Sequence, residues 1–143
     1  MARCLAILTL SLSIAACSAS GPAFRKLAVP PGKAVIYAYR PDAFFGRVRS
    51  PYVYCGDGSV DLKPGGYHPF VVEPGSVTCI STTEPLSMGF KEWRSGTAKV
   101  EVRVEAGKES FVKEKLGYFG TPYLFLMDRF SAESEIPECK LQP

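Results

Sequence analysis

Near the start of the chain, mostly hydrophobic residues form a run without any charge, whereas farther along hydrophobic residues alternate with charged ones. Residues 5–16 carry no charge and come shortly after a single basic residue, Arg3. This apolar run is shorter than the roughly 20 residues that a helix needs to cross the hydrocarbon core of a membrane. A positive charge followed by a short apolar run is typical of a signal peptide. We therefore predict that residues 1–16 are a leader that is removed from the mature protein.

Beyond residue 32, short runs rich in β-branched and aromatic residues are separated by glycine and proline. In the clearest run, 98–105, alanine and valine alternate with charged residues. A period of two predicts a strand with one buried and one wet face. Several such strands at short spacing predict that 33–143 form an all-β domain, a small antiparallel β-sandwich. The other predicted strands are 33–40, 52–55, 59–62, 67–73, 76–82 and 110–116.

Glycine and proline mark the turns between these strands. Gly56-Asp57-Gly58 predicts a hairpin whose turn needs a residue with positive φ. Lys63-Pro64-Gly65-Gly66 has proline and glycine at the two central positions that a type II turn prefers. Pro74-Gly75 repeats this pair after the next run, so that two Pro-Gly turns predict antiparallel hairpins on either side of one strand. Pro69 inside that strand predicts an edge position or a bulge, because proline cannot donate a ladder hydrogen bond.

The segments that flank these strands are of different kinds. Residues 17–32 are small and turn-forming, which predicts a flexible tether with a reach on the order of 20 to 25 Å. Residues 122–127 are apolar but too few to predict a helix, and 128–140 are polar and compatible with one short C-terminal helix.

The leader ends in Ile14-Ala15-Ala16-Cys17, which resembles the lipobox of bacterial lipoproteins. Lipidation needs a thiolate nucleophile preceded by small residues, and Cys17 meets both demands. Two acyl chains, each worth roughly 0.8 kcal/mol per buried CH₂, give stable anchoring. We predict a diacylglycerol anchor with palmitate-type chains on Cys17. Ser18 at the next position resembles lipoproteins that are sorted to the periplasmic face of the Gram-negative outer membrane.

Charge and size narrow the class of protein. Removing residues 1–16 leaves 127 residues, enough for one domain. These residues include 16 basic and 14 acidic ones with no long run of one sign, which excludes a nucleic-acid-binding surface. The densest positive stretches, Arg25-Lys26 and Arg47-Val48-Arg49, hold two charges each, so the lipid is expected to provide the anchoring.

Three cysteines besides Cys17 belong to the mature chain. In an oxidising compartment an odd number indicates one disulfide and one leftover thiol. We favour Cys55 with Cys79, because both lie in strand-like runs, and the alternative is a pair that includes Cys139 from the polar tail. A single histidine and the lack of a Cys-x-x-Cys pair argue against a metal site, and no cofactor is predicted.

The motifs from residue 30 to residue 83 resemble a family of small bacterial lipoproteins known as domain of unknown function 2846. Its first strand carries Tyr-x-Tyr-Arg-Pro, here residues 37–41, and a turn around Asp57-Gly58 follows. Leu-x-x-Gly-x-Tyr at 62–67 and Pro74-Gly75 complete the pattern. The resemblance implies a small sandwich like the Pro-Gly-hairpin domains of bacterial surface proteins. It implies no activity and no catalytic residue, and the pair Cys55 and Cys79 is not part of it.

Candidate catalytic residues are few. His68 is the single imidazole, and no Gly-x-Ser-x-Gly motif accompanies it. Asp42, Asp57 and Asp61 stand in or beside predicted turns, where aspartate is common for reasons of turn chemistry. We therefore predict no catalytic residues and a protein that is not an enzyme.

Aromatic residues are the better candidates for binding. Tyr37 and Tyr39 share one face of their strand, and the pair at 52 and 54 shares one face of another. We predict that these pairs pack in the core, although an exposed pair would offer a platform for a sugar or a peptide. Phe44 and Phe45, beside Arg47 in a loop, cannot both be buried by one strand face and are the predicted partner surface.

Together these features predict a membrane-anchored envelope lipoprotein. Its predicted role is that of a non-enzymatic binding or scaffolding module for a periplasmic protein or a cell-wall component. The alternative is an inhibitor or immunity-type lipoprotein that blocks an enzyme through the loop 42–50.

Overall fold

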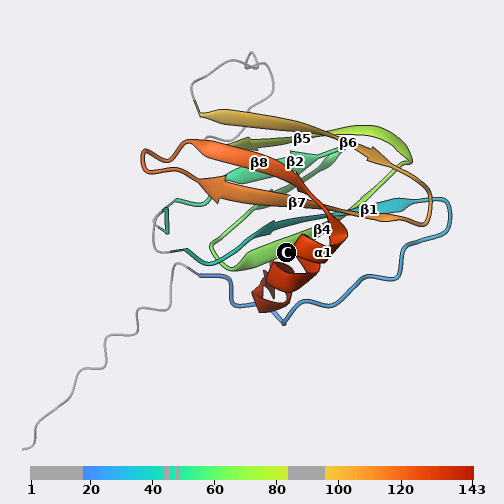
Figure 1. Cartoon of the computed structure of the whole chain (residues 1–143), viewed down its shortest axis with the longest axis horizontal. Helices are drawn as coiled ribbons and strands as arrows, with labels where there is room; N and C mark the ends of the chain where they lie inside the picture. The colour runs from blue at the N-terminus through green and yellow to red at the C-terminus, as the bar shows by residue number, and fades with distance from the viewer. Residues whose placement is uncertain (1–17, 44–45, 48, 84–95) are drawn as a thin grey trace, which may run out of the picture.

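Two β-sheets pack face to face, and a short helix covers the outer side of one of them (Figure 1). This computed structural model describes residues 18–43, 46–47, 49–83 and 96–143. One sheet has the strand order β8-β7-β1-β4-β9 and the other β3-β2-β5-β6. The predicted all-β sandwich is therefore confirmed. The elements are β1 (Ala34–Arg40), β2 (Tyr52–Cys55), β3 (Gly58–Asp61), β4 (Gly66–Val72), β5 (Gly75–Thr82), β6 (Thr97–Val104), β7 (Glu109–Leu116), β8 (Pro122–Met127), α1 (Arg129–Glu135), a 3-10 turn (Ile136–Glu138) and β9 (Lys140–Leu141).

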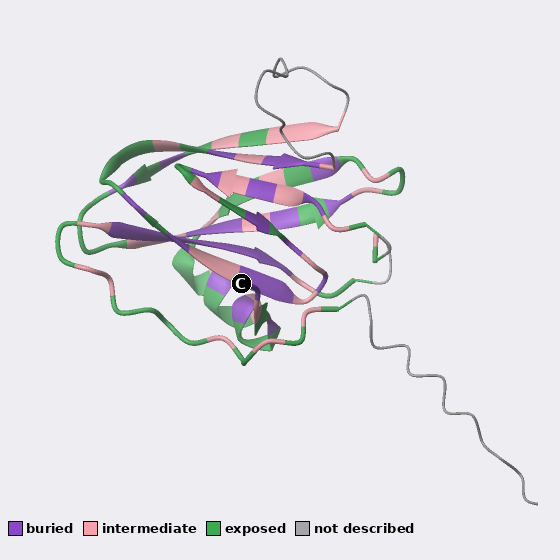
Figure 2. Ribbon diagram, turned by 180° about the vertical axis from the view of Figure 1, so that it is seen from behind, coloured by how far each residue is buried: buried purple, intermediate pink, exposed green. Residues whose placement is uncertain are grey.

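Strand β1 is buried over its whole length because both of its faces are covered (Figure 2). It pairs in parallel with β7 and antiparallel with β4. Ala34, Ile36 and Ala38 face the four-stranded sheet and join the core between the two layers. The alternate residues belong to a second core on the outer side of the five-stranded sheet.

The second core joins the five-stranded sheet to both ends of the chain. Tyr37 stacks on Phe111 of β7, with ring centroids 5.5 Å apart. Asp128 caps α1 by accepting a hydrogen bond from the Ser131 N–H at 2.9 Å, which confirms the predicted short C-terminal helix. The buried members of this cluster are Val35, Tyr37, Tyr39, Tyr67, Phe111, Ala132, Ile136 and Cys139.

The segment predicted as a flexible tether instead packs along this outer face. The Ala19 N–H donates to the Pro64 carbonyl at 3.0 Å, and the Leu27 N–H donates to the Tyr37 hydroxyl at 2.6 Å. The Phe24 ring meets Tyr37 and Tyr67 edge-on, with centroid distances of 5.4 and 4.9 Å. The prediction from composition was wrong for residues 19–29, because the ring and carbonyl partners that hold them come from distant parts of the chain.

The Pro64-Gly65 turn forms and Pro74 is a bend, but neither joins a hairpin. The Gly66 N–H donates to the Lys63 carbonyl at 3.0 Å, and Gly65 has a φ of 68°, as a type II turn requires. This turn leads from β3 to β4, and Pro74 leads from β4 to β5; in both cases the chain passes from one sheet to the other. Beyond Tyr67, β4 is an edge strand, since β9 pairs only with its first two residues, so Pro69 costs the sheet no bond there.

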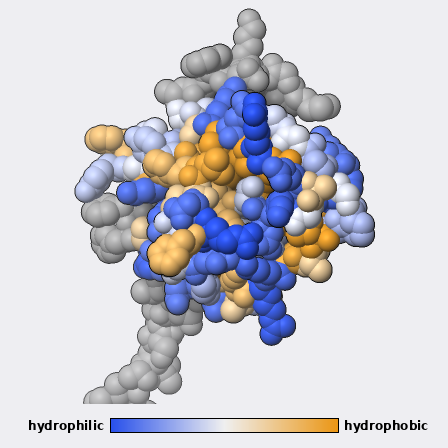
Figure 3. All heavy atoms as spheres, turned by 45° about the vertical axis from the view of Figure 1, so that its right-hand side comes forward, coloured by the Kyte–Doolittle hydropathy of each residue, from blue (hydrophilic) through white to orange (hydrophobic). Residues whose placement is uncertain are grey.

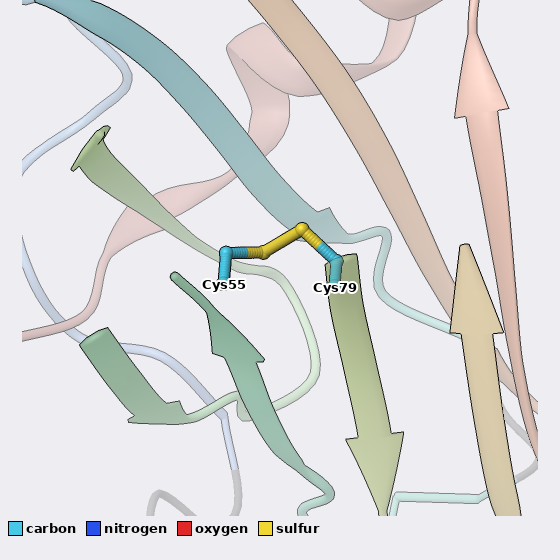
Figure 4. The surroundings of a disulfide bond; sticks show 2 residues. All are labelled: Cys55 and Cys79. Atoms are coloured by element: carbon cyan, nitrogen blue, oxygen red, sulfur yellow. A yellow bond between two sulfur atoms is a disulfide. The ribbon is translucent and has the colours of Figure 1, made fainter. Parts of the chain in front are cut away.

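The disulfide joins Cys55 and Cys79, as predicted (Figure 4). These residues are direct partners in the antiparallel pair of β2 and β5, and both are buried between the sheets. At the end of β2, a turn with a φ of 60° at Gly56 leads into β3. Cys139 remains a free, buried thiol, and burial raises its pKa to about 12.

The packed N-terminal segment leads to a prediction about stability. Phe24→Ala should lower the free energy of unfolding by about 2 kcal/mol, because it removes a partly buried ring from an aromatic cluster. Leu27→Ala is the matched control, since the Leu27 side chain is 41% exposed and its hydrogen bond uses only the backbone. Urea unfolding of the two variants checks this. A neutral effect of both changes would mean that the segment is a loose tether after all.

Candidate functional site

The predicted partner surface at 42–50 is described only in part. Phe44, Phe45 and Val48 lie outside the described residues. Arg47 is exposed and forms a two-pronged ion pair with Asp42, through Nε at 3.1 Å and Nη2 at 2.5 Å. Its guanidinium is therefore engaged within its own loop.

A buried arginine holds this loop against the end of the sandwich. Arg40 is the last residue of β1, and its side chain points into the space between the sheets. Its Nη1 donates to the carbonyls of Arg49 at 2.8 Å and Leu62 at 3.2 Å, and its Nη2 donates to the Gly46 carbonyl at 2.7 Å. One guanidinium thus fixes two connections between the sheets, the one from β1 to β2 and the one from β3 to β4.

Glu114 is the buried counter-charge of Arg40, with Oε2 at 3.4 Å from Nε. Burial raises the pKa of Glu114 to about 7, against the opposing effects of Arg40 and of the Ser81 hydroxyl. Within the described part of the chain, neither carboxylate oxygen completes a hydrogen bond of normal geometry. Glu114 and Arg40 line a cleft of about 340 Å³ at the C-terminal ends of the paired strands β1 and β7.

The alternation of residues along β7 indicates that Glu114 is buried. Val112, Glu114 and Leu116 occupy alternate positions of one strand, so an inward-facing valine and leucine bracket the carboxylate. A charge at the middle position of an apolar face indicates a buried partner of opposite sign.

The other polar residues considered as catalytic candidates, His68, Asp57 and Asp61, do not come together in a site. His68 Nδ1 donates to the Gln142 carbonyl at 2.7 Å, and its ring packs edge-on against Phe70. Asp57 and Asp61 are exposed. Among the described residues, no group of three or more histidine, cysteine or acidic side chains is arranged to hold a metal ion.

The predicted core packing is confirmed for Tyr37 and Tyr39, which are fully buried. The Tyr39 hydroxyl donates to Glu135 Oε2 at 3.0 Å, and Lys113 Nζ reaches the other oxygen of that carboxylate at 2.7 Å. This network ties α1 to the sheet. Tyr52 and Tyr54 are half-buried on the outer side of the other sheet.

The exposed aromatic pair lies on β8, which sequence analysis did not select. Tyr123 is 47% and Phe125 46% exposed, and their rings are nearly parallel, with an angle of 17° and a centroid distance of 6.4 Å. Lys115 and Lys113 are their direct neighbours on β7. We call Tyr123, Phe125 and Lys115 the aromatic strip. Figure 3 shows that apolar side chains gather in a patch bordered by hydrophilic ones on one face of the molecule.

The turn between β7 and β8 carries a second exposed pair. Tyr118 is 81% and Phe119 96% exposed. They occupy the centre of a tight turn in which the Gly120 N–H donates to the Gly117 carbonyl at 3.0 Å. This turn and Arg49 together line a shallow cleft of about 300 Å³.

Comparison with known proteins adds no relative: no protein-family model matches this chain, and no curated protein matches it. The resemblance noted in the sequence therefore stays a prediction. Over the described residues, the structure contains no helix with the length and apolar character needed to span a membrane.

The buried carboxyl group leads to a pH prediction. The pKa of Glu114 is about 7 in the folded protein and about 4.5 when unfolded. Between pH 4.5 and pH 7 the Glu114 carboxyl group is therefore protonated in the native state but ionised in the unfolded state. Its contribution to stability is therefore present at low pH and lost as pH rises from about 4.5 to 7, by about 3 kcal/mol in total.

Glu114→Gln keeps the shape of the side chain and cannot ionise. The difference in unfolding free energy between wild type and this variant should change by up to about 3 kcal/mol across that pH window. Chemical denaturation at several pH values measures it, and subtracting the two curves cancels the other titrating groups. Parallel curves would contradict the assignment.

Proposed function

We propose that this protein is a lipid-anchored, non-enzymatic binding module of the cell envelope. Its partner would be a cell-wall component or a periplasmic protein, bound at the aromatic strip. The anchor rests on Ile14-Ala15-Ala16-Cys17, and binding rests on one observation: two nearly parallel, half-exposed rings next to a lysine on the outer side of a rigid sheet.

The position of the aromatic strip favours a binding role. Helix α1 and the N-terminal segment cover the outer face around β1 and β4, and the strip is the part of that face over which aromatic rings stay exposed. The Tyr123 ring packs directly over the backbone of Gly117. A Cβ at Gly117 would come within 3.1 Å of the ring, so the lack of a side chain there allows this contact. Pre-positioned rings lose little entropy on binding and offer a large contact area.

The chemistry of the strip favours a glycan strand of the wall among these partners. The C–H-bearing faces of sugar rings pack well on aromatic rings, and the spacing of 6.4 Å allows adjacent contacts along one chain. The Tyr123 hydroxyl and the exposed Lys115 supply a polar and a cationic group for hydroxyl or carboxylate substituents.

Two further observations support a role without catalysis. His68 is engaged with a backbone carbonyl, and Glu114 faces Arg40 inside the fold. The alternative of an enzyme inhibitor acting through 42–50 has less support, since the Arg47 guanidinium is held by Asp42 within its own loop.

The anchor predicts the fate of a Cys17→Ser variant. Without the thiol no diacylglyceryl group can be attached, so the variant should appear as an uncut precursor or as an unlipidated, released protein. Membrane fractionation and intact mass measurement distinguish these forms from the wild type. A mature, membrane-bound Cys17→Ser protein would rule out the lipid anchor.

Binding at the strip predicts that Tyr123→Ala/Phe125→Ala weakens cosedimentation with purified cell-wall sacculi by about tenfold, since two aromatic anchors are lost. Phe130→Ala is the matched control, because Phe130 is 85% exposed on α1 and lies outside the strip. Both proteins should remain folded at the assay temperature, which urea unfolding checks, because the double variant loses two half-buried rings and its unfolding midpoint is expected to fall. Equal retention of the two variants on sacculi would refute the glycan assignment.

A further inference from the structure

Several turns that are distant in sequence meet at one end of the sandwich. Strands β1 and β7 run parallel and end together at Arg40 and Leu116, and the antiparallel strand β4 begins there at Gly66. The tight turn 117–120, the residues around Arg49 and the Pro64-Gly65 turn therefore share this end. We call these three segments the tip end.

The described chain also begins at this end of the sandwich: in Figure 1 its blue start and the orange turn between β7 and β8 lie on the same side of the molecule. The Ala19 N–H is bound to the Pro64 carbonyl. Gly21 lies so close to the Leu141 backbone that a Cβ would meet its carbonyl oxygen, so only glycine allows this approach. The attachment of residues 19–21 to the fold is thus specific.

This attachment changes the geometry of an anchored protein. A single residue, Ser18, separates Cys17 from Ala19. Two residue steps span at most about 7 Å of extended chain. A lipid on Cys17 would therefore hold the tip end against the membrane. The distance between the membrane and Ala19 would be smaller than the roughly 10 Å diameter of one helix.

The side chains at the tip end suit such a position. Among the described residues, Phe119 and Tyr118 are the first and third most exposed of the large hydrophobic side chains, and they project from a two-glycine turn. Aromatic side chains with an apolar body are enriched at membrane–water interfaces. The Arg49 side chain lies beside Gly120, which places a cation next to the aromatic pair, where it can meet anionic headgroups.

We propose that Tyr118 and Phe119 insert into the interfacial layer of an anionic phospholipid membrane and fix the orientation of the domain on it. The proposal rests on the anchor part of the proposed function and does not involve the aromatic strip. In this orientation the lipid on Cys17 and the aromatic turn form two separate contacts with one surface, and Arg49 lies at the level of the headgroups.

Depth-dependent quenching tests this orientation. In a Trp93→Phe background the full chain, expressed and processed in cells, carries either Phe119→Trp or the control Phe130→Trp. Phe130 is also highly exposed but lies beside Asp128, past the opposite end of β8. Both proteins are reconstituted into phosphatidylethanolamine–phosphatidylglycerol vesicles with brominated acyl chains. We expect a blue-shifted emission for the tryptophan at 119 and about threefold stronger quenching than at 130, given an insertion depth of roughly 5–10 Å.

Flotation of the same vesicles separates the two claims. If the proteins float and the two tryptophans are quenched equally, or the one at 119 less, the orientation is wrong while the anchor stands. If neither protein floats and neither tryptophan is quenched, the anchor and the orientation both fail. A further variant, Arg49→Gln, should reduce the quenching at 119 in these anionic vesicles and leave that at 130 unchanged.

Discussion

The burial of β1 on both faces is the constraint on which the rest of the structure depends. A strand whose alternate residues are Val35, Tyr37 and Tyr39 on one side, and alanine and isoleucine on the other, exposes large apolar area unless two layers cover it. The four-stranded sheet covers one side. The other side is covered by α1 together with the N-terminal segment, which brings the two ends of the domain together.

The tyrosines also make this second layer specific. Each buried phenol needs a partner for its hydroxyl, because an unpaired buried polar group costs about 1–3 kcal/mol. Tyr37 accepts from the backbone of Leu27, and Tyr39 donates to Glu135 of α1. The hydroxyls therefore select which segments of the chain lie on the sheet and in which register.

At the C-terminal end of β1, the buried Arg40 side chain links the core to the neighbouring turns. Its guanidinium replaces the water that the carbonyls of Gly46, Arg49 and Leu62 would otherwise bind. Removing one member of a buried ion pair costs about 3–5 kcal/mol, so Glu114 and the surrounding turns are linked to the stability of the core. The tip end is thus built on the same strand as the core, and the aromatic strip lies on a neighbouring pair of strands, β7 and β8.

Local patterns determined much of this protein from its sequence alone. The alternation at 98–105 and the type II turn at Pro64-Gly65 follow from periodicity and backbone preference, whereas the position of the cysteines in strands favoured the pair of Cys55 and Cys79 without excluding Cys139. The tertiary structure decided which sheet each strand joins, that Phe24 is packed against Tyr37 and Tyr67, and that the exposed aromatic pairs are on β8 and its preceding turn rather than on β1. Sequence periodicity tells which side of a strand is apolar, but not which distant segment covers that side. That choice depends on contacts between residues far apart in the chain, and here those contacts decide where the N-terminal segment lies and which aromatic side chains stay exposed.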